Sequence, residues 1–278
     1  MEIAKQITVQ INSQSSDGTG FIIFRDKNNY YVLTNNHVVR ENLAYSIRTH
    51  DGKKHPLTGG IGFQKQPNDP DLAIVSFNSQ NNYPLAILGD SNQAQIGNPI
   101  FVYGYPSIGG LDGEARQAEF SPGYITSIRQ GEAGGYNLRF NAVTWGGMSG
   151  SPVLTNNGEV IGVHGRGDNG IFRLPVLRLD GNSSQVITAL PTGFNSAVPI
   201  NILIDLISKI KPSSSNLKLD NNLTSNNQSL LSNPQSAEDY YIRGLTRADQ
   251  GNTLEAVADY TKALRMNPNN AMAYYIEV

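Results

Sequence analysis

The feature that most constrains this chain is a succession of short apolar segments over its first 200 residues. Each segment is rich in β-branched and aromatic residues, and Gly, Asn, Asp or Pro separates it from the next. Many short strands at roughly even spacing are typical of β-sandwiches and β-barrels. We therefore predict an all-β fold for this region. Representative segments are GFIIF (20–24), YYVLT (30–34), LAIVSF (72–77), PIFVYGY (99–105) and GYITSI (123–128).

Two segments at the borders of this region have their own patterns. Residues 1–14 (MEIAKQITVQINSQ) alternate like a strand and lack the apolar core of a signal peptide. Residues 200–210 (INILIDLISKI) carry apolar residues at helical spacing, so we predict one amphipathic helix there. No run of 18 apolar residues occurs, and we expect no membrane-spanning helix.

Charge and cysteine content exclude several classes of function. The formal net charge is -2 and there is no long basic block, which argues against nucleic acid or an anionic membrane as the main partner. The chain has no cysteine, so disulfides, thiol catalysis and cysteine-based metal sites are excluded. We expect no metal or organic cofactor. We also expect a cytoplasmic location, with an exported protein without cysteine as the alternative.

The last quarter of the chain has a different character. Half of residues 211–236 are Ser or Asn, which buries little apolar surface and predicts a flexible linker. Residues 237–278 then resemble a tetratricopeptide repeat (TPR), whose period is about 34 residues. AMAYY (271–275) echoes AEDYY (237–241) one period earlier, so we expect one full repeat and a truncated second one. The small and aromatic positions that match the repeat are Ala237, Tyr240, Gly244, Gly251, Ala256, Tyr260, Ala263 and Pro268.

The segment TWGGMSGSPVL (144–154) is a candidate for part of a catalytic site. Gly, Ser and Pro cluster in any loop, so the segment predicts at least a tight turn before a strand. Ser149 could also be a nucleophile held up by that turn. A serine hydroxyl then needs a base within reach, a group that orients the base, and donors for the oxyanion.

Two further strand ends supply candidates for the base and its orienting group. His37 follows the apolar strand in YYVLTNNHVV, and Asp71 precedes the strand in NDPDLAIVSF. A histidine at a strand end is usually structural, and an aspartate there is often a turn residue. The order His37, Asp71, Ser149 nevertheless matches the chymotrypsin arrangement and not that of subtilisin or the α/β-hydrolases.

Three sequence blocks together resemble the signatures of the trypsin/chymotrypsin clan of serine proteases. They are VLTNNHVV, DLAIV and GGMSGSPV with GEVIGVHG, and they are most similar to the high-temperature-requirement and glutamyl endopeptidase branches. The resemblance runs over about residues 5–210 and implies a double β-barrel with the site between the barrels. It makes residues 1–210 a protease domain, followed by the linker (211–236) and the TPR segment (237–278).

The resemblance also implies roles for individual residues. Ser149 would attack the peptide carbonyl, His37 would carry its proton, and Asp71 would orient the histidine. The amides of Gly147 and Ser149 would form the oxyanion hole, where Gly147 avoids a Cβ clash. Met148 and Ser151 depart from the residue types common at their positions, but neither removes a catalytic group.

Specificity is less well determined by the sequence. Val143, six residues before Ser149, supplies no anion for a basic substrate side chain, whereas Thr144 and His164 could donate to a carboxylate. We predict a preference for Glu, with a small or apolar preference as the alternative and His164 as a packed strand residue in that case. Residues 165–196 are long for a pocket wall and leave its other residues unassigned. The predicted substrate-binding residues are Thr144, Trp145, His164, Gly165 and Arg166.

The predicted function is therefore a serine endopeptidase that acts on a protein or peptide. The TPR segment would bind a protein substrate or regulator in its concave face. Two alternatives are left open: a protease that is unlocked by a partner on the repeats, and a non-catalytic scaffold in which only the repeats function.

Overall fold

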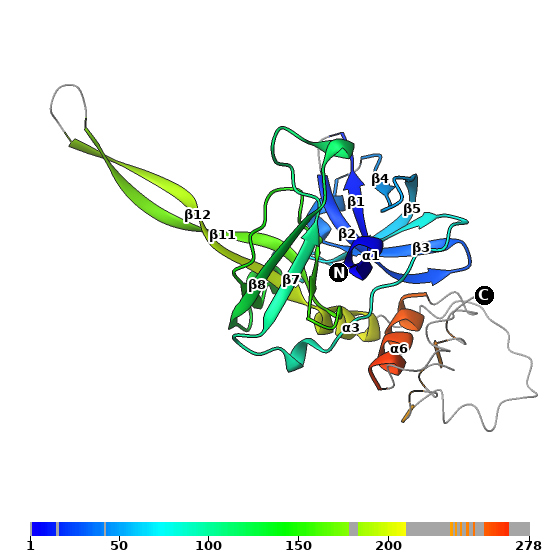
Figure 1. The fold of residues 1–278 in the computed structure, drawn as a ribbon. Helices are drawn as coiled ribbons and strands as arrows, with labels where there is room; N and C mark the ends of the chain where they lie inside the picture. Colours follow the sequence, from blue (N-terminus) through cyan, green and yellow to red (C-terminus); the bar gives the residue numbers. More distant parts are fainter. Residues whose placement is uncertain are drawn as a thin grey trace, which may run out of the picture.

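The chain forms two closed six-stranded β-barrels (Figure 1), which confirms the predicted double barrel. The computed structural model describes residues 2–14, 17–41, 43–177, 183–209 and 253–266, with isolated positions between 234 and 247. The arrangement of two antiparallel barrels is that of chymotrypsin. A small number of helices flank the barrels in the described part of the chain.

Strand order in the first barrel is β1-β2-β3-β6-β5-β4, and in the second it is β10-β11-β12-β9-β8-β7. The strands of the first barrel are β1 (Thr8–Asn12), β2 (Asp17–Asp26), β3 (Asn29–Thr34), β4 (Ser46–Arg48), β5 (Lys54–Gly62) and β6 (Ala73–Asn78). Those of the second are β7 (Pro99–Gly104), β8 (Glu119–Ile128), β9 (Leu138–Phe140), β10 (Pro152–Leu154), β11 (Val160–Leu177) and β12 (Ser183–Pro199).

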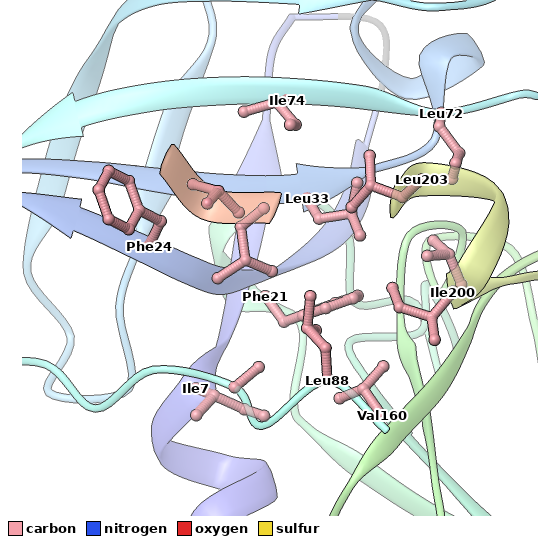
Figure 2. Close-up of a cluster of buried hydrophobic side chains, with 14 of the residues drawn as sticks. Ile7, Phe21, Phe24, Leu33, Leu72, Ile74, Leu88, Val160, Ile200 and Leu203 are labelled. Atoms are coloured by element: carbon pink, nitrogen blue, oxygen red, sulfur yellow. The ribbon is translucent and has the colours of Figure 1, made fainter. Parts of the chain in front are cut away.

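Each barrel has its own apolar interior, and a third apolar cluster joins the two. The interiors form because side chains alternate between the two faces of a strand. In strand β7, for example, every second side chain is buried. The joining cluster contains Phe21 and Leu33 from the first barrel and Val160 from the second (Figure 2). Burial of side chains of this size stabilises the fold by about 1.5–3 kcal/mol each, so the cluster keeps the barrels together.

Of the two predictions for the ends of the barrel region, one is confirmed and one is wrong. Residues 200–210 were predicted as a helix, and α3 (Ile200–Lys209) confirms it. Residues 1–14 were predicted as a strand, but Glu2–Ile7 form helix α1 and only β1 is extended. The apolar residues Ala4 and Ile7 are three apart and share the buried face of α1. The alternation of apolar and polar residues in this segment resembles a strand, so this helical spacing was overlooked.

Strands β11 and β12 continue far beyond the second barrel as a two-stranded arm (Figure 1). Their pairing runs from Gly162 opposite Pro199 out to Leu177 opposite Ser183. Most of the segment 165–196 is therefore paired with itself instead of forming a pocket wall. Only the barrel end of the arm can border a site between the barrels.

Helix α6 (Thr253–Met266), in the C-terminal segment, packs against the first barrel and α3. The ring of Tyr260 stacks on that of Phe24, with centroids 5.6 Å apart, and Arg265 donates to the carbonyl oxygen of Leu88. Almost all of the predicted linker, and the second-repeat segment 271–275, lie outside the described residues. The TPR assignment and the domain boundaries remain predictions.

The other described helical segments are short. They are α2 (Asn36–Val39) and three 3₁₀ turns at Ser91–Gln93, Gly113–Ala115 and Ala133–Gly135. None of the described helices has the length and apolar character needed to cross a bilayer.

Candidate active site

His37 and Asp71 meet at one end of the first barrel. His37 lies in α2, directly after β3, and Asp71 lies just before β6, which pairs with β3. The distance from His37 Nδ1 to Asp71 Oδ2 is 2.6 Å, and the backbone N–H of His37 donates to Asp71 Oδ1 at 2.9 Å. Both carboxylate oxygens thus hold one residue, which leaves His37 Nε2 as the ring nitrogen available to a substrate or nucleophile.

Asp71 is buried and has further donors. Burial alone would raise the pKa of its carboxyl, but the hydrogen bond and charge of His37, with the hydroxyl of Tyr136, outweigh it and leave the pKa below its usual value. Tyr136 donates to Asp71 Oδ2 at 2.6 Å. Asn35 Nδ2 donates to the backbone oxygen of Asp71 at 2.8 Å, which fixes the chain on the other side. Asp71 is therefore held as a carboxylate facing the imidazole.

Ser149 lies in the turn between β9 and β10 of the second barrel. Gly147 and Gly150 flank it with φ of +87° and +92°, a conformation that other residues rarely adopt. A Cβ on Gly150 would lie 1.8 Å from the Thr19 carbonyl oxygen and 2.3 Å from Thr34 Oγ1. The turn thus packs directly against the end of β3, three residues before His37.

The backbone donors of this turn fall into two groups. The amides of Met148, Gly150 and Ser151 each donate to a backbone carbonyl. The amides of Gly147 and Ser149 have no acceptor among the described residues. Free donors on alternate residues are the arrangement that an oxyanion hole needs. No hydrogen bond joins the Ser149 hydroxyl to His37 in the described part of the chain, and in free enzymes such bonds are often long.

We call the turn 146–151, which carries the predicted nucleophile Ser149, the nucleophile turn. Thr19 of the first barrel holds it. Its backbone N–H donates to the Ser149 carbonyl at 2.8 Å, and its hydroxyl donates to the Gly147 carbonyl at 2.8 Å. Both bonds fix the peptide units that directly follow Gly147 and Ser149. The orientation of the turn is thus set from β2.

Arg116 is a second support and is almost completely buried. Its guanidinium donates to the carbonyl oxygens of Gly147 at 3.1 Å and Tyr105 at 2.6 Å. It also reaches the carbonyls of Ile11 and Gly18 and Asn12 Oδ1, all in the first barrel or its first hairpin. The amide of Ser107 donates to the Gly146 carbonyl at 2.8 Å. The segment 105–116 therefore joins β1, β2 and the nucleophile turn.

The predicted pocket residues are brought together only in part. Thr144 donates to Asn195 Oδ1 at 2.8 Å, and Asn195 in turn donates to the Ala142 carbonyl. The side chains of Val143 and Trp145 are largely exposed. Thr144 and the barrel end of β12 thus form one polar wall, and Asn195 belongs to it although the sequence did not identify it.

His164 is fully buried beneath this wall. Its Nδ1 lies 3.3 Å from the Ser196 carbonyl, and its ring meets the edge of Phe140. Burial lowers the pKa of His164 to about 4, so the imidazole is neutral at neutral pH. Since a carbonyl only accepts, Nδ1 carries the proton and Nε2 is an acceptor.

Gly165 and Arg166 contact Tyr136 instead of an open pocket. A Cβ on Gly165 would lie 2.4 Å from the Tyr136 hydroxyl. The Arg166 guanidinium lies 4.9 Å from the centre of the Tyr136 ring and pairs with Glu132 at 3.6 Å. Arg166, which the sequence predicted to bind substrate, thus pairs with Glu132 and lies over Tyr136.

Met148, which departs from the usual residue type, has a packing role. It is 1 % exposed and belongs to the apolar interior of the second barrel. Apolar character at this position is therefore required by the barrel and does not disturb the free amides on either side.

Comparison with known proteins gives relatives among bacterial serine proteases. A probable periplasmic serine endoprotease DegP-like from Chlamydia pneumoniae is 32% identical over 151 residues, 53% of this chain and 28% of the relative. The serine protease Do-like HtrA of Lactococcus lactis is 26% identical over 208 residues, 71% of this chain and 45% of the relative. The chain thus spans well under two thirds of these relatives.

The expected cytoplasmic location is contradicted by these names. The relatives from Chlamydia pneumoniae and Brucella suis are both named as periplasmic enzymes. The expectation failed because a chain without cysteine is compatible with reducing and oxidising compartments alike.

A family model for the trypsin-like peptidase domain matches residues 18–163, which is more than half of the 278 residues. The matched range contains His37, Asp71 and Ser149 in this order. The predicted class of enzyme, a trypsin-like serine endopeptidase, is confirmed by the match. This chain belongs to the trypsin-like peptidase domain family.

Proposed function

We propose that this chain hydrolyses peptide bonds with Ser149 as nucleophile, His37 as general base and Asp71 as the group that orients His37. The observation that carries the proposal is the contact of 2.6 Å between His37 Nδ1 and Asp71 Oδ2. It fixes the tautomer in which Nε2 can accept the proton of a serine hydroxyl. The nucleophile turn lies against Thr34, which is three residues before His37 in the sequence, so the turn and His37 are at the same end of β3.

The proposed reaction follows from these positions. Ser149 Oγ attacks the substrate carbonyl while its proton passes to His37 Nε2. The oxyanion accepts hydrogen bonds from the free amides of Gly147 and Ser149, each worth about 3 kcal/mol in the transition state. His37 then protonates the leaving amine, and water repeats the sequence on the acyl-enzyme.

The direct test is cleavage of an unfolded protein such as casein and of a peptide library by the parent and by Ser149→Ala. The variant should fold and lose about 10⁴-fold or more in turnover, because no other group replaces the nucleophile. A purified Ser149→Ala protein that cleaves as fast as the parent would exclude this function. The non-catalytic alternative predicts no turnover by either protein.

Two contacts bear on which residue the enzyme prefers before the scissile bond. The Thr144 hydroxyl is already donated to Asn195, and His164 Nε2 is an acceptor at neutral pH. Neither group then donates to a carboxylate, which supports a small or apolar preference at neutral pH. A preference for Glu is expected only where His164 is protonated.

The C-terminal segment is proposed to be a TPR that recruits a protein substrate or regulator. Its support is the repeat spacing and the helix α6 over residues that match it, among them Ala256, Tyr260 and Ala263. Pull-down with the Ser149→Ala protein, with and without residues 237–278, tests recruitment. An unchanged set of captured proteins would contradict it.

The location is proposed to be periplasmic, as the names of the relatives state for those proteins. Fractionation of cells that express the chain from its own gene tests this. Recovery of the protein with cytosolic markers would contradict it.

A further inference from the structure

The Asp71 carboxylate has a donor that the proposed mechanism does not use. His37 Nδ1 and the Tyr136 hydroxyl both lie 2.6 Å from the same oxygen, Oδ2. Oδ1 accepts only from the His37 backbone N–H, at 2.9 Å, among the described residues. Tyr136 is 5 % exposed, so water does not compete for this contact. The hydroxyl thus shares the charge of the oxygen that faces the imidazole.

The chain around Tyr136 is built to hold this contact. Gly134 and Gly135 have φ of +72° and +75°, which turns the backbone sharply just before the tyrosine. The Gly134 carbonyl accepts from the Asp71 amide at 2.9 Å. The segment therefore makes two hydrogen bonds to Asp71, one through its backbone and one through a side chain.

Gly165 leaves the space that the hydroxyl needs. A Cβ there would lie 2.4 Å from the Tyr136 hydroxyl and 2.5 Å from Asn35 Oδ1. Both atoms belong to residues that bond to Asp71. Strand β11 thus carries no side chain of its own at this point, and the donor comes from Tyr136.

We propose that Tyr136 is a positioning residue for the His37–Asp71 pair, and that its hydroxyl fixes the angle and the charge that the carboxylate presents to His37. The proposal rests on the proposed function, because it assigns Asp71 the orienting role. Arg166 lies over the outer face of the Tyr136 ring and connects this support to the barrel end of the β11–β12 arm.

The charged groups around the pair are consistent with a neutral phenol. Burial, followed by the charge of Asp71, raises the pKa of Tyr136, so the hydroxyl remains a donor throughout the range in which the protein is handled. Arg166 faces Tyr136 and is paired with Glu132. From β11, His164 is the remaining titratable group near His37, and burial keeps it neutral at neutral pH.

Removal of the hydroxyl has two opposite consequences for His37. The carboxylate concentrates its charge on the imidazolium, which favours the protonated ring. It also becomes free to turn, so fewer molecules hold the productive geometry. Tyr136→Phe should therefore lower kcat and move the acid limb of the pH–rate profile to higher pH.

The experiment compares Tyr136→Phe with Tyr124→Phe, an exposed tyrosine of the same barrel. For Tyr136→Phe we expect kcat to fall about tenfold or more, with KM within about twofold, well short of the ~10⁴ lost when the histidine tautomer is wrong. The acid limb should move to higher pH, since the charge of the Asp71 carboxylate is no longer shared with the hydroxyl. Tyr124→Phe should match the parent.

A second measurement separates this inference from the proposed function. ¹⁵N spectra of histidine-labelled protein follow the His37 ring as it titrates, whether or not a substrate is known. A shifted His37 titration in Tyr136→Phe alone supports positioning. Parent-like kinetics and titration in Tyr136→Phe overturn it. A parent protein that cleaves nothing overturns the proposed function, while the spectra still decide the role of Tyr136.

Discussion

The two halves of the site are held in different ways. In the first barrel, His37 and Asp71 are fixed by side-chain contacts, chiefly the two bonds of 2.6 Å on Asp71 Oδ2. In the second barrel, Ser149 is fixed by backbone atoms, through two glycines with positive φ and carbonyls held by Thr19 and Arg116. The base half depends on which side chains are present, and the nucleophile half depends on how one turn is oriented.

The comparison teaches that each half is held partly from the other barrel. Thr19 on β2 donates to the carbonyls of Gly147 and Ser149, so the turn of the second barrel is oriented from the first. Tyr136, between β8 and β9 of the second barrel, donates to Asp71 of the first. The following predictions test these two kinds of support, from the largest expected effect to the smallest.

Loss of the Arg116 side chain should affect stability most. Arg116→Met removes a buried donor shared by carbonyls in β1, β2 and the nucleophile turn, so these buried oxygens lose one of their hydrogen bonds. We expect the free energy of unfolding to fall by about 3–5 kcal/mol, measured by urea titration. Arg25→Met, at a half-buried position of β2, is the matched control and should change it by less than about 1 kcal/mol. Equal effects of the two changes would remove Arg116 from the account.

A side chain at Gly147 should damage the nucleophile half alone. The Cβ of Gly147→Ala would lie 2.7 Å from the Tyr105 carbonyl oxygen, and its φ of +87° is unfavourable for alanine. We expect kcat to fall about 10²–10³-fold, the usual cost of one oxyanion donor. Gly97→Ala shares the positive φ but meets no atom within 4 Å, and it should leave kcat unchanged. Parent-like kcat in Gly147→Ala would show that this amide is not used.

The buried histidine of the second barrel should make stability depend on pH. Because burial lowers the pKa of His164 to about 4, from an ordinary value of 6.5, the unfolded chain binds a proton there before the folded one does. Its contribution is complete above pH 6.5 and is lost as the pH falls toward 4, at up to about 1.4 kcal/mol per pH unit.

Urea unfolding at about pH 7.5 and about pH 5 should therefore show a loss that is about 2 kcal/mol smaller in His164→Gln than in the parent. The matched change in the first barrel is His55→Gln. Burial also lowers the pKa of His55, but the charge of Asp51 opposes it, so a smaller effect is expected. The same pH dependence in parent and His164→Gln would mean that His164 is not buried neutral.

The smallest effect concerns specificity. The test uses peptides that differ only in the residue before the scissile bond. At neutral pH, kcat/KM should be higher with Ala or Val at this position than with Glu, by a factor that corresponds to about 1–3 kcal/mol. The Glu substrate should gain at acidic pH in the parent but not in His164→Gln. A preference for Glu that is present at neutral pH and survives His164→Gln would assign the pocket to other residues.

The sequence identified residues that carry chemistry better than residues that hold them. His37, Asp71 and Ser149 stand in ordered blocks, the strand pattern predicted an all-β fold, and the resemblance to the protease clan implied the two barrels. Thr19, Arg116 and Tyr136 were missed because each acts on a backbone oxygen or a carboxylate far away in the sequence, and single residue types carry no such signal. The Gly-rich stretch DGTGF around Thr19 was the nearest indication, since close backbone approach requires glycine.

Arg166 and His164 show what a position in the sequence leaves open. Both were assigned to the pocket from their positions after VIGV, which specify a strand but not the direction of a side chain. In the structure the His164 ring is buried against Phe140, and Arg166 lies on Tyr136. Alternation along a strand predicts that side chains point to two faces, but not what each face contacts. In this strand the contacts are set by Ser196, next to His164, and by Glu132, next to Arg166.

The central claim is that the two differently held halves act as one catalytic unit, and a double-mutant cycle tests it most directly. The turnover of casein is measured for the parent, His37→Ala, Ser149→Ala and the double variant, after each is shown to be folded. If the halves act together, each single change costs about 10⁴-fold or more and the double variant is no slower than the single ones. Losses that multiply in the double variant, or a Ser149→Ala protein that retains parent turnover, would contradict the account.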